Sequence, residues 1–199
     1  MKQSGLSDRH AFGRILRAAA LTATLSGAAA AQADARERPV ERYDVRTAGT
    51  SAGAARTVVR AGDGVVRSVV TDFSRYPDFI SRFKTAKVIG KSGDKTDVYL
   101  QVPILNGAVK IWAVVRFDPP KEVNGGQVVS GKMLKGNVKR LDAVWRIQPL
   151  DAESTELKLE LTIVPDLPVP EAVVLPEVRY AAAKAVSGTR DEAERRATH

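Results

Sequence analysis

The chain has 199 residues, of which 44% are hydrophobic and 27% charged, with 31 basic and 23 acidic side chains, no cysteine and two histidines. This composition is that of an ordinary globular protein with a mild basic excess, which by itself does not indicate nucleic acid as a partner. The histidines are His10 and His199, so the chain between them has neither His nor Cys. That excludes Cys–His and Ser–His catalysis and the usual zinc sites there, and we expect no cofactor or metal.

The first 33 residues have the pattern of an export signal. A basic start, with Lys2, Arg9, Arg14 and Arg17, precedes an uncharged Ala- and Leu-rich run over 18–30. Ala31-Gln32-Ala33 then matches the small-x-small pattern that signal peptidase cleaves. The alternatives are an amphipathic surface helix or a mitochondrial presequence. We expect a periplasmic or secreted protein, with a signal over 1–33, a flexible linker over 34–54 and one domain over 55–199.

Two short helices are predicted after a first strand at 57–60. Asp63 can cap a helix whose valines at 65, 66, 69 and 70 form one apolar face. Ser74 can cap a second helix, with Pro77 in its first turn. From Phe83 onward apolar residues alternate with polar ones, which predicts strands at 87–91, 98–104, 109–117, 127–134, 141–147 and 156–163. Asn106-Gly107 is a hairpin signal, and the whole pattern predicts an antiparallel meander with one wet face.

A long amphipathic helix is predicted at the C-terminus. After the proline-rich break over 165–170, apolar or small residues recur at helical spacing from Leu175 to Thr189. We expect this helix to run from Pro176 to about Arg196, with Pro176 at its start, and to cover the apolar face of the sheet. The fold class is therefore α+β.

One segment resembles a known superfamily. Residues 70–79, VTDFSRYPDF, resemble the DF-x-x-YP-x-F segment of START-like (SRPBCC) proteins, and are most similar to the polyketide cyclase/dehydrase and coenzyme-Q-binding branch. Gly136-Asn137 and residues 143–149 resemble a later strand of that branch. The resemblance implies a helix-grip fold: a curved antiparallel sheet, two short helices and a long C-terminal helix packed across it. It also implies a cavity between sheet and helix for a lipid, quinone, polyketide or other apolar ligand.

The inward faces of the predicted elements supply the candidate walls of such a cavity. We expect them to include Tyr76, Leu100, Val102, Ile111, Val115, Ala143, Trp145, Leu161, Val178 and Ala182. For Trp145, ordinary core packing is the alternative. The helix face formed by Ala182, Ala185 and Gly188 is low in volume, which fits either close packing on the sheet or space left for a ligand.

Three functions remain open at this level. The first is an exported carrier or binding protein for a hydrophobic small molecule. The second is a polyketide cyclase or dehydratase, although no acid/base pair is evident, and Asp142 with Arg140 and Arg146 fits a surface ion-pair set. The third is an envelope interaction module without a ligand. A basic cluster, Lys132, Lys135, Lys139 and Arg140, could also contact an anionic membrane surface, unless it is a solvated hairpin tip.

Overall fold

The computed structural model describes residues 39–199 apart from 48–49, 105–108 and 167. The predicted export signal and the Asn106-Gly107 turn lie outside the described residues. Within these residues, nine strands form one antiparallel sheet in the order β1-β2-β9-β8-β7-β5-β4-β3, with β6 paired to β7. The strands are β1 Glu41–Thr47, β2 Thr50–Val59, β3 Thr85–Ser92, β4 Lys95–Ile104, β5 Val109–Phe117, β6 Lys121–Val123, β7 Gly126–Gly136, β8 Val138–Pro149 and β9 Thr155–Pro165.

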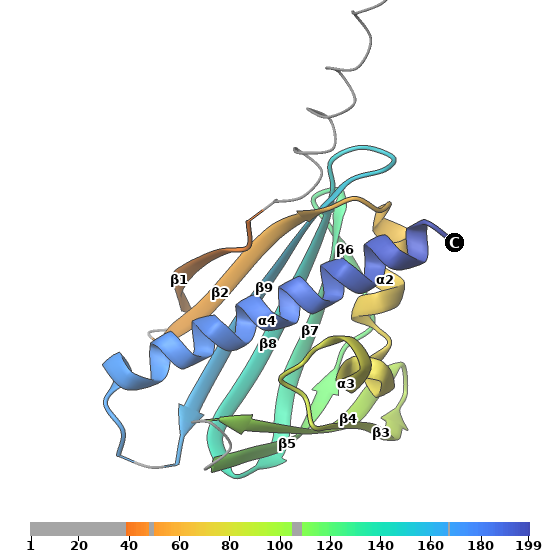
Figure 1. Cartoon of the computed structure of the whole chain (residues 1–199). Coiled ribbons are helices and arrows are strands. Elements are labelled where there is room, and N and C mark those ends of the chain that lie inside the picture. Colours follow the sequence, from red (N-terminus) through yellow and green to blue (C-terminus); the bar gives the residue numbers. More distant parts are fainter. Residues whose placement is uncertain (1–38, 48–49, 105–108, 167) are drawn as a thin grey trace, which may run out of the picture. The chain divides into compact units, whose positions relative to one another are not determined.

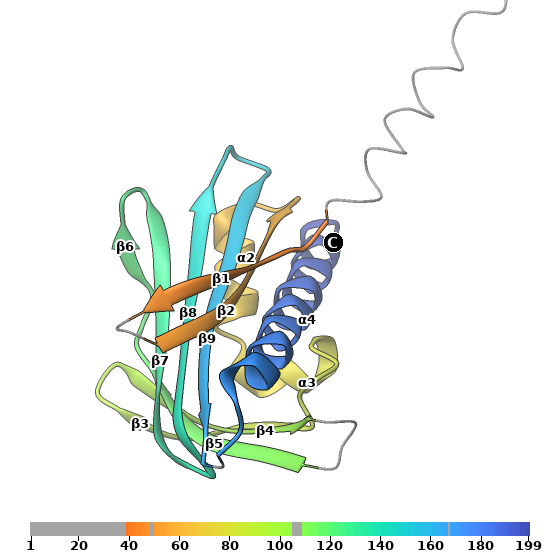
Figure 2. The ribbon, with the colours of Figure 1, turned by 90° about the vertical axis from the view of Figure 1, so that its left-hand side faces the viewer.

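The described helical elements are α2 Asp63–Val70, the 3-10 turn η1 Phe73–Arg75, α3 Tyr76–Phe79 and α4 Glu171–Ala197. The long helix α4 lies diagonally across one face of the sheet, and α2 and α3 lie beside its C-terminal half (Figure 1). The view from the side shows the sheet and α4 as two layers (Figure 2). This is the helix-grip arrangement that the sequence predicts. No described helix combines the length and the apolar character needed to cross a bilayer.

The sheet begins earlier in the chain than the sequence predicts. Residues 41–47 and 50–54, which we expected in a flexible linker, belong to β1 and β2, and β2 also pairs with β9. Their Gly- and Ala-rich composition has a packing reason, since Ala52, Ala54 and Ala55 are buried. A Cβ on Gly53 would lie 2.5 Å from the backbone nitrogen of Arg179. Small residues therefore let α4 lie directly on the backbone of β2.

Helix α4 also begins earlier than predicted. It starts at Glu171 with Pro170 as N-cap, so Pro176 lies inside the helix rather than at its start. A proline at this position cannot donate a hydrogen bond to the preceding turn. The loss is tolerated because none of residues 171–177 is buried, whereas seven residues between Val178 and Ala193 are. The first two turns of α4 thus extend beyond the part of the helix that packs on the sheet.

The sequence places α2 well. Its valines at 66, 69 and 70 are buried as the helical spacing predicts, although the N-cap is Gly62 and Asp63 is the first helical residue. Between α3 and α4 the contact is unusually close, because a Cβ on Gly188 would lie 2.1 Å from the carbonyl oxygen of Phe79.

Two irregularities interrupt the regular pairing of the sheet, one between Val114 and Val115 and one between Val138 and Arg140. Bulges bend and twist strands, which fits the curvature of the sheet around α4.

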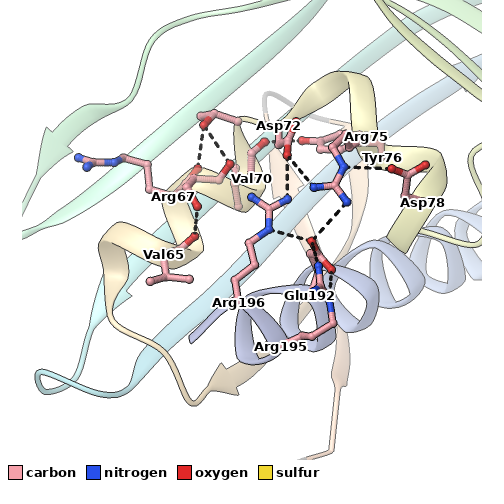
Figure 3. A network of polar contacts seen from close by, with 12 residues as sticks. Val65, Arg67, Val70, Asp72, Arg75, Tyr76, Asp78, Glu192, Arg195 and Arg196 are labelled. Carbon is pink, nitrogen blue, oxygen red and sulfur yellow. Dashed lines mark hydrogen bonds and ion pairs between the residues drawn. The ribbon is translucent and has the colours of Figure 1, made fainter. Parts of the chain in front are cut away.

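A network of charged side chains joins the start of the α2–η1 turn to the end of α4 (Figure 3). Glu192, with a side chain only 7% exposed, accepts hydrogen bonds of 2.8 Å from both Arg195 and Arg196. Arg196 also donates to Asp72 at 2.7 Å, and Arg75 contacts Asp72, Asp78 and Glu192. The network holds the segment that carries Tyr76 against the last turns of α4.

This network predicts a loss of stability at acidic pH. Burial alone would raise the pKa of Glu192, but the hydrogen bonds and positive charges of Arg196 and Arg195 outweigh it and lower the pKa below its ordinary value. A carboxyl whose pKa is lower in the folded than in the unfolded chain stabilises the fold at neutral pH. That stabilisation fades as the pH falls below about 4.3, the ordinary pKa of Glu, through the folded-state value.

We therefore expect Glu192→Gln to lower the free energy of unfolding at pH 7 by about 2 kcal/mol. The difference from the wild type should shrink as the pH falls below 4, which urea unfolding at a series of pH values would measure. The variant Glu153→Gln is a control, because Glu153 is exposed in the turn between β8 and β9. This substitution should leave the free energy of unfolding unchanged at every pH. A difference for Glu192→Gln that stays constant from pH 7 to pH 3 would contradict this role of the carboxylate.

Candidate functional site

An apolar cavity of about 220 Å³ lies between the inner face of the sheet and the first half of α4. Its walls come from α3, the segment after it, strands β4, β5, β8 and β9, the connection from β9 to α4, and α4 itself. The lining residues are Tyr76, Arg82, Phe83, Leu100, Val102, Ile111, Ala113, Phe117, Asn137, Val138, Leu141, Ala143, Trp145, Leu159, Leu161, Ile163, Pro165, Asp166, Val169, Val173, Val174, Glu177, Val178, Ala181 and Ala185.

Two polar side chains of the wall, the buried Tyr76 and the exposed Asn137, bond to the protein itself. Tyr76 donates a hydrogen bond of 2.6 Å to the carbonyl oxygen of Val70, one of the unpaired carbonyls at the end of α2. The indole of Trp145 lies near the Tyr76 hydroxyl. The Asn137 side chain bridges the backbone of β5, since it accepts from the Trp112 N–H at 2.8 Å and donates to the Lys110 carbonyl at 2.7 Å. These pairings leave ring faces and aliphatic groups to face the cavity.

Burial sets the protonation state of Tyr76. Its side chain is almost inaccessible to solvent, and the desolvation raises the pKa of the hydroxyl far above its ordinary value. The nearby indole of Trp145 lowers the pKa slightly and does not cancel this shift. Tyr76 therefore stays protonated at neutral pH and acts as a donor to Val70, not as a base.

The mouth of the cavity carries the charged and the exposed lining residues. Val169 and Val173 are exposed although they are apolar. Arg82 donates to Glu177 at 3.3 Å, and its guanidinium carbon lies 5.0 Å from the centre of the Tyr180 ring. Asp166 lies 3.8 Å from Lys139. The cavity is thus apolar inside and has a polar rim beneath the overhanging first turns of α4.

The structure brings eight of the ten predicted wall residues together around this cavity: Tyr76, Leu100, Val102, Ile111, Ala143, Trp145, Leu161 and Val178. Val115 and Ala182 are not among the lining residues, and both are fully buried. Val115 shares the inward face of β5 with the lining residues Ala113 and Phe117, but it packs beside Gly131 of β7 instead of bordering the cavity. Trp145 has both roles considered for it, since it is only 2% exposed and also forms part of the wall.

Ala182 does not line the cavity, whereas the preceding residue of α4, Ala181, does. Two stripes run along α4 with spacings of four, three and four residues. The first, Val174, Val178, Ala181 and Ala185, lines the cavity. The second, Ala182, Val186, Thr189 and Ala193, is fully buried, and α4 makes its most extensive contacts with β2. The small residues of α4 therefore divide between the two uses considered for them: Ala185 leaves space in the cavity, and Gly188 permits close packing.

Several lining residues were not predicted. Leu141, Leu159 and Ile163 share the inward strand face with predicted neighbours, so the alternation itself could have identified them. Ala181 also carries such a signal, through helix periodicity. Val138 does not, because it faces the cavity through the bulge between Val138 and Arg140. No pattern in the sequence indicates Arg82 or Glu177, because their meeting depends on how α4 overhangs the segment after α3.

The remaining candidates lie outside the cavity. Arg146 pairs with Glu160 at 3.1 Å, and Arg140 pairs with Asp142, as expected for surface ion pairs. Lys132, Lys135 and Lys139 are exposed at the β7–β8 hairpin beside Leu134, so contact with an anionic membrane stays a prediction. The described residues contain no group of three or more His, Cys, Asp or Glu side chains placed to hold a metal ion.

Comparison with solved structures identifies the same fold in other proteins. The chain is similar to the STAR-related lipid transfer protein from Xanthomonas axonopodis, with a TM-score of 0.66 at 13% identity over 77% of this chain and 93% of that one. It is also similar to the Zhui aromatase/cyclase from Streptomyces sp. R1128, with a TM-score of 0.62 at 19% identity over 78% and 96%. A START superfamily protein from Mycobacterium smegmatis gives a TM-score of 0.59 at 21% identity over 73% and 95%.

At these identities the structural likeness establishes the fold. No curated protein matches the sequence. The family model described as "Polyketide cyclase / dehydrase and lipid transport" matches residues 65–186, more than half of the chain, from α2 to the middle of α4. Both results agree with the resemblance of residues 70–79. The chain belongs to the polyketide cyclase/dehydrase and lipid transport family, within the START-like superfamily.

Proposed function

We propose that this protein binds a hydrophobic small molecule in the cavity between the sheet and α4, and carries or presents it outside the cytoplasm. The observation that carries the proposal is the cavity itself. Its walls are almost wholly apolar, and the hydroxyl of Tyr76 and the amide of Asn137 are paired within the protein. An apolar space of this kind gains free energy by taking up an apolar ligand instead of water. Solved proteins of this fold include a lipid transfer protein.

The volume limits the ligand. The cavity holds about 220 Å³, below the roughly 300–1,000 Å³ of pockets that enclose a drug-sized molecule. An apolar protein cavity of about 150 Å³ is enough for benzene. The cavity therefore fits a one- or two-ring molecule or a segment of an acyl chain, and a longer ligand would extend through the mouth beside Val169 and Val173.

The wall supports binding rather than chemistry. Of its deep residues only Tyr76 is titratable, and the raised pKa of its hydroxyl keeps it protonated and engaged with Val70. A cyclase or dehydratase needs an acid or base within reach of the reacting atoms. We therefore favour a carrier over an enzyme, although solved proteins of this fold include an aromatase/cyclase. The basic, Ala-rich first 33 residues support export.

Filling the cavity tests this function. Ala143 lines the cavity on β8, whereas Val144, the next residue, does not. We expect the wild type to bind an uncharged apolar fluorophore such as N-phenyl-1-naphthylamine with one-to-one stoichiometry, with the naphthyl group inside the cavity and the phenyl ring at the mouth. Ala143→Leu should raise the Kd at least about tenfold, since the added carbons occupy the ligand's space. A tenfold change corresponds to a loss of about 1.4 kcal/mol of binding free energy. Val144→Leu should leave it unchanged. Equal binding by the wild type and Ala143→Leu would show that the fluorophore binds elsewhere.

A further inference from the structure

Arg82 is the cation at the mouth of the apolar cavity. Its side chain is 19% exposed, and it lies in the segment after α3, beside the first turns of α4. One nitrogen, Nη2, donates to Glu177 at 3.3 Å, and the guanidinium lies over the Tyr180 ring. Its Nε–H is buried and has no acceptor. Arg82 is therefore held in place by α4 but only partly satisfied by it.

Two other arginines of this protein show which group pairs with the guanidinium edge formed by Nε and Nη2. Arg116 donates from both Nε and Nη2 to Asp97, at 2.7 and 2.8 Å. Arg195 donates from the same two nitrogens to Glu192, at 2.9 and 2.8 Å. This two-point pairing is the preferred geometry between arginine and a carboxylate. In Arg82 the corresponding edge is half filled, by one longer contact to Glu177.

A buried donor without an acceptor is rare in native proteins, because its hydration is lost and nothing replaces it. Arg82 lines the cavity. If Glu177 turned away, the Nε–Nη2 edge of Arg82 could turn toward an acceptor on a molecule bound there. We propose that the ligand of this cavity is amphipathic, and that Arg82 binds an anionic carboxylate at its polar end while the apolar body occupies the cavity. This inference rests on the proposed function and names the ligand class for the same site.

Glu177 has a defined place in this recognition. It lines the same mouth with a 42% exposed side chain and competes for the same edge of Arg82. An incoming carboxylate would take over the Nε–Nη2 edge, and Glu177 would turn toward solvent. Glu177 therefore opposes acid binding through both competition and like charge, so its removal should strengthen the binding of an acid and leave a neutral ligand unaffected.

The test compares two probes of equal chain length, octanoate and 1-octanol, by competition with N-phenyl-1-naphthylamine at pH 7.5. The informative quantity is the ratio of the Kd for octanol to the Kd for octanoate. We expect Arg82→Gln to lower this ratio at least about tenfold, as expected for a two-point charged hydrogen bond. Arg82→Lys should lower it less, and Glu177→Gln should raise it. Arg146→Gln, which removes an arginine from a surface pair outside the cavity, should leave it unchanged.

Each outcome bears on a different claim. If the ratio is the same in the wild type, Arg82→Gln and Glu177→Gln, Arg82 only latches α4 and the acid-binding proposal is overturned. Octanol binding in every variant would then still support the apolar cavity and report an intact fold. If neither probe nor the fluorophore binds the wild type, the proposed function itself fails. Octyl phosphate serves as a third probe: a higher affinity than octanoate would overturn the carboxylate in favour of a phosphate.

Discussion

Replacement of Trp145 by alanine is expected to lower the free energy of unfolding by about 3 kcal/mol, at the lower end of the range for large aromatic residues in a core. The side chain is 2% exposed and forms part of the cavity wall. The part of the ring that faces the cavity has no protein atoms to lose, which keeps the cost below that of a fully packed tryptophan. The same truncation removes a large ligand-contact surface, so we expect most of the ligand-induced stabilisation to disappear.

Thermal unfolding of the wild type and Trp145→Ala, each with and without 1-octanol, measures both effects. A ligand stabilises the folded state in proportion to the logarithm of its concentration over its Kd, so weaker binding gives a smaller shift in Tm. Trp145→Phe is the matched control, because it keeps an aromatic ring against the ligand and should retain most of the ligand-induced shift. A severe loss of stability with an undiminished ligand shift would mean that Trp145 is ordinary core and that the ligand lies elsewhere.

Replacement of Gly188 by alanine is expected to be nearly as damaging, at about 3 kcal/mol, although it adds a single methyl group. The new Cβ would lie 2.1 Å from the Phe79 carbonyl oxygen, 3.0 Å from its carbonyl carbon and 3.2 Å from the Cα of Ile80. All three are backbone atoms, so no rotation of a side chain can relieve the overlap. Either α4 or α3 must shift, and both contribute to the cavity wall.

Gly64 provides the opposite case within the same protein. It also lies in a helix, α2, but a Cβ there would meet nothing within 4 Å. Gly64→Ala should be neutral or stabilising by up to about 1 kcal/mol, because alanine is the better helix former. Urea unfolding of the two variants beside the wild type measures this contrast. Equal stability of Gly188→Ala and the wild type would contradict the close packing of α4 on α3.

The sequence was most informative where a residue's place follows from periodicity. Alternation in β4, β8 and β9 identified Leu100, Ala143 and Leu161 as inward-facing, and all three line the cavity. The segment around Tyr76 carried the family resemblance that the family model supports. Periodicity also places Val115 and Ala182 on inward faces, and both are buried. It cannot show that they pack against protein neighbours instead of lining the cavity, because that depends on tertiary contacts.

The other differences arise from tertiary contacts that no local pattern encodes. The Gly- and Ala-rich stretch around Gly53 resembles a linker in composition, yet it is a strand, because only small residues allow α4 to pack on its backbone. Pro176 was placed at the start of α4, and the helix instead extends five residues further toward the N-terminus. That overhang creates the mouth of the cavity and brings Glu177 to Arg82, so the polar part of the site emerges only in the folded chain.

Native mass spectrometry of the protein purified from its own host shows whether the cavity holds a hydrophobic small molecule. We expect the wild type to show one additional mass per chain that is released on denaturation, and Ala143→Leu to lack it. The measured mass of the polypeptide should be that of a chain starting at Asp34, since the predicted signal ends at Ala33. A wild type that carries no such mass and binds none of the added apolar probes would contradict the account.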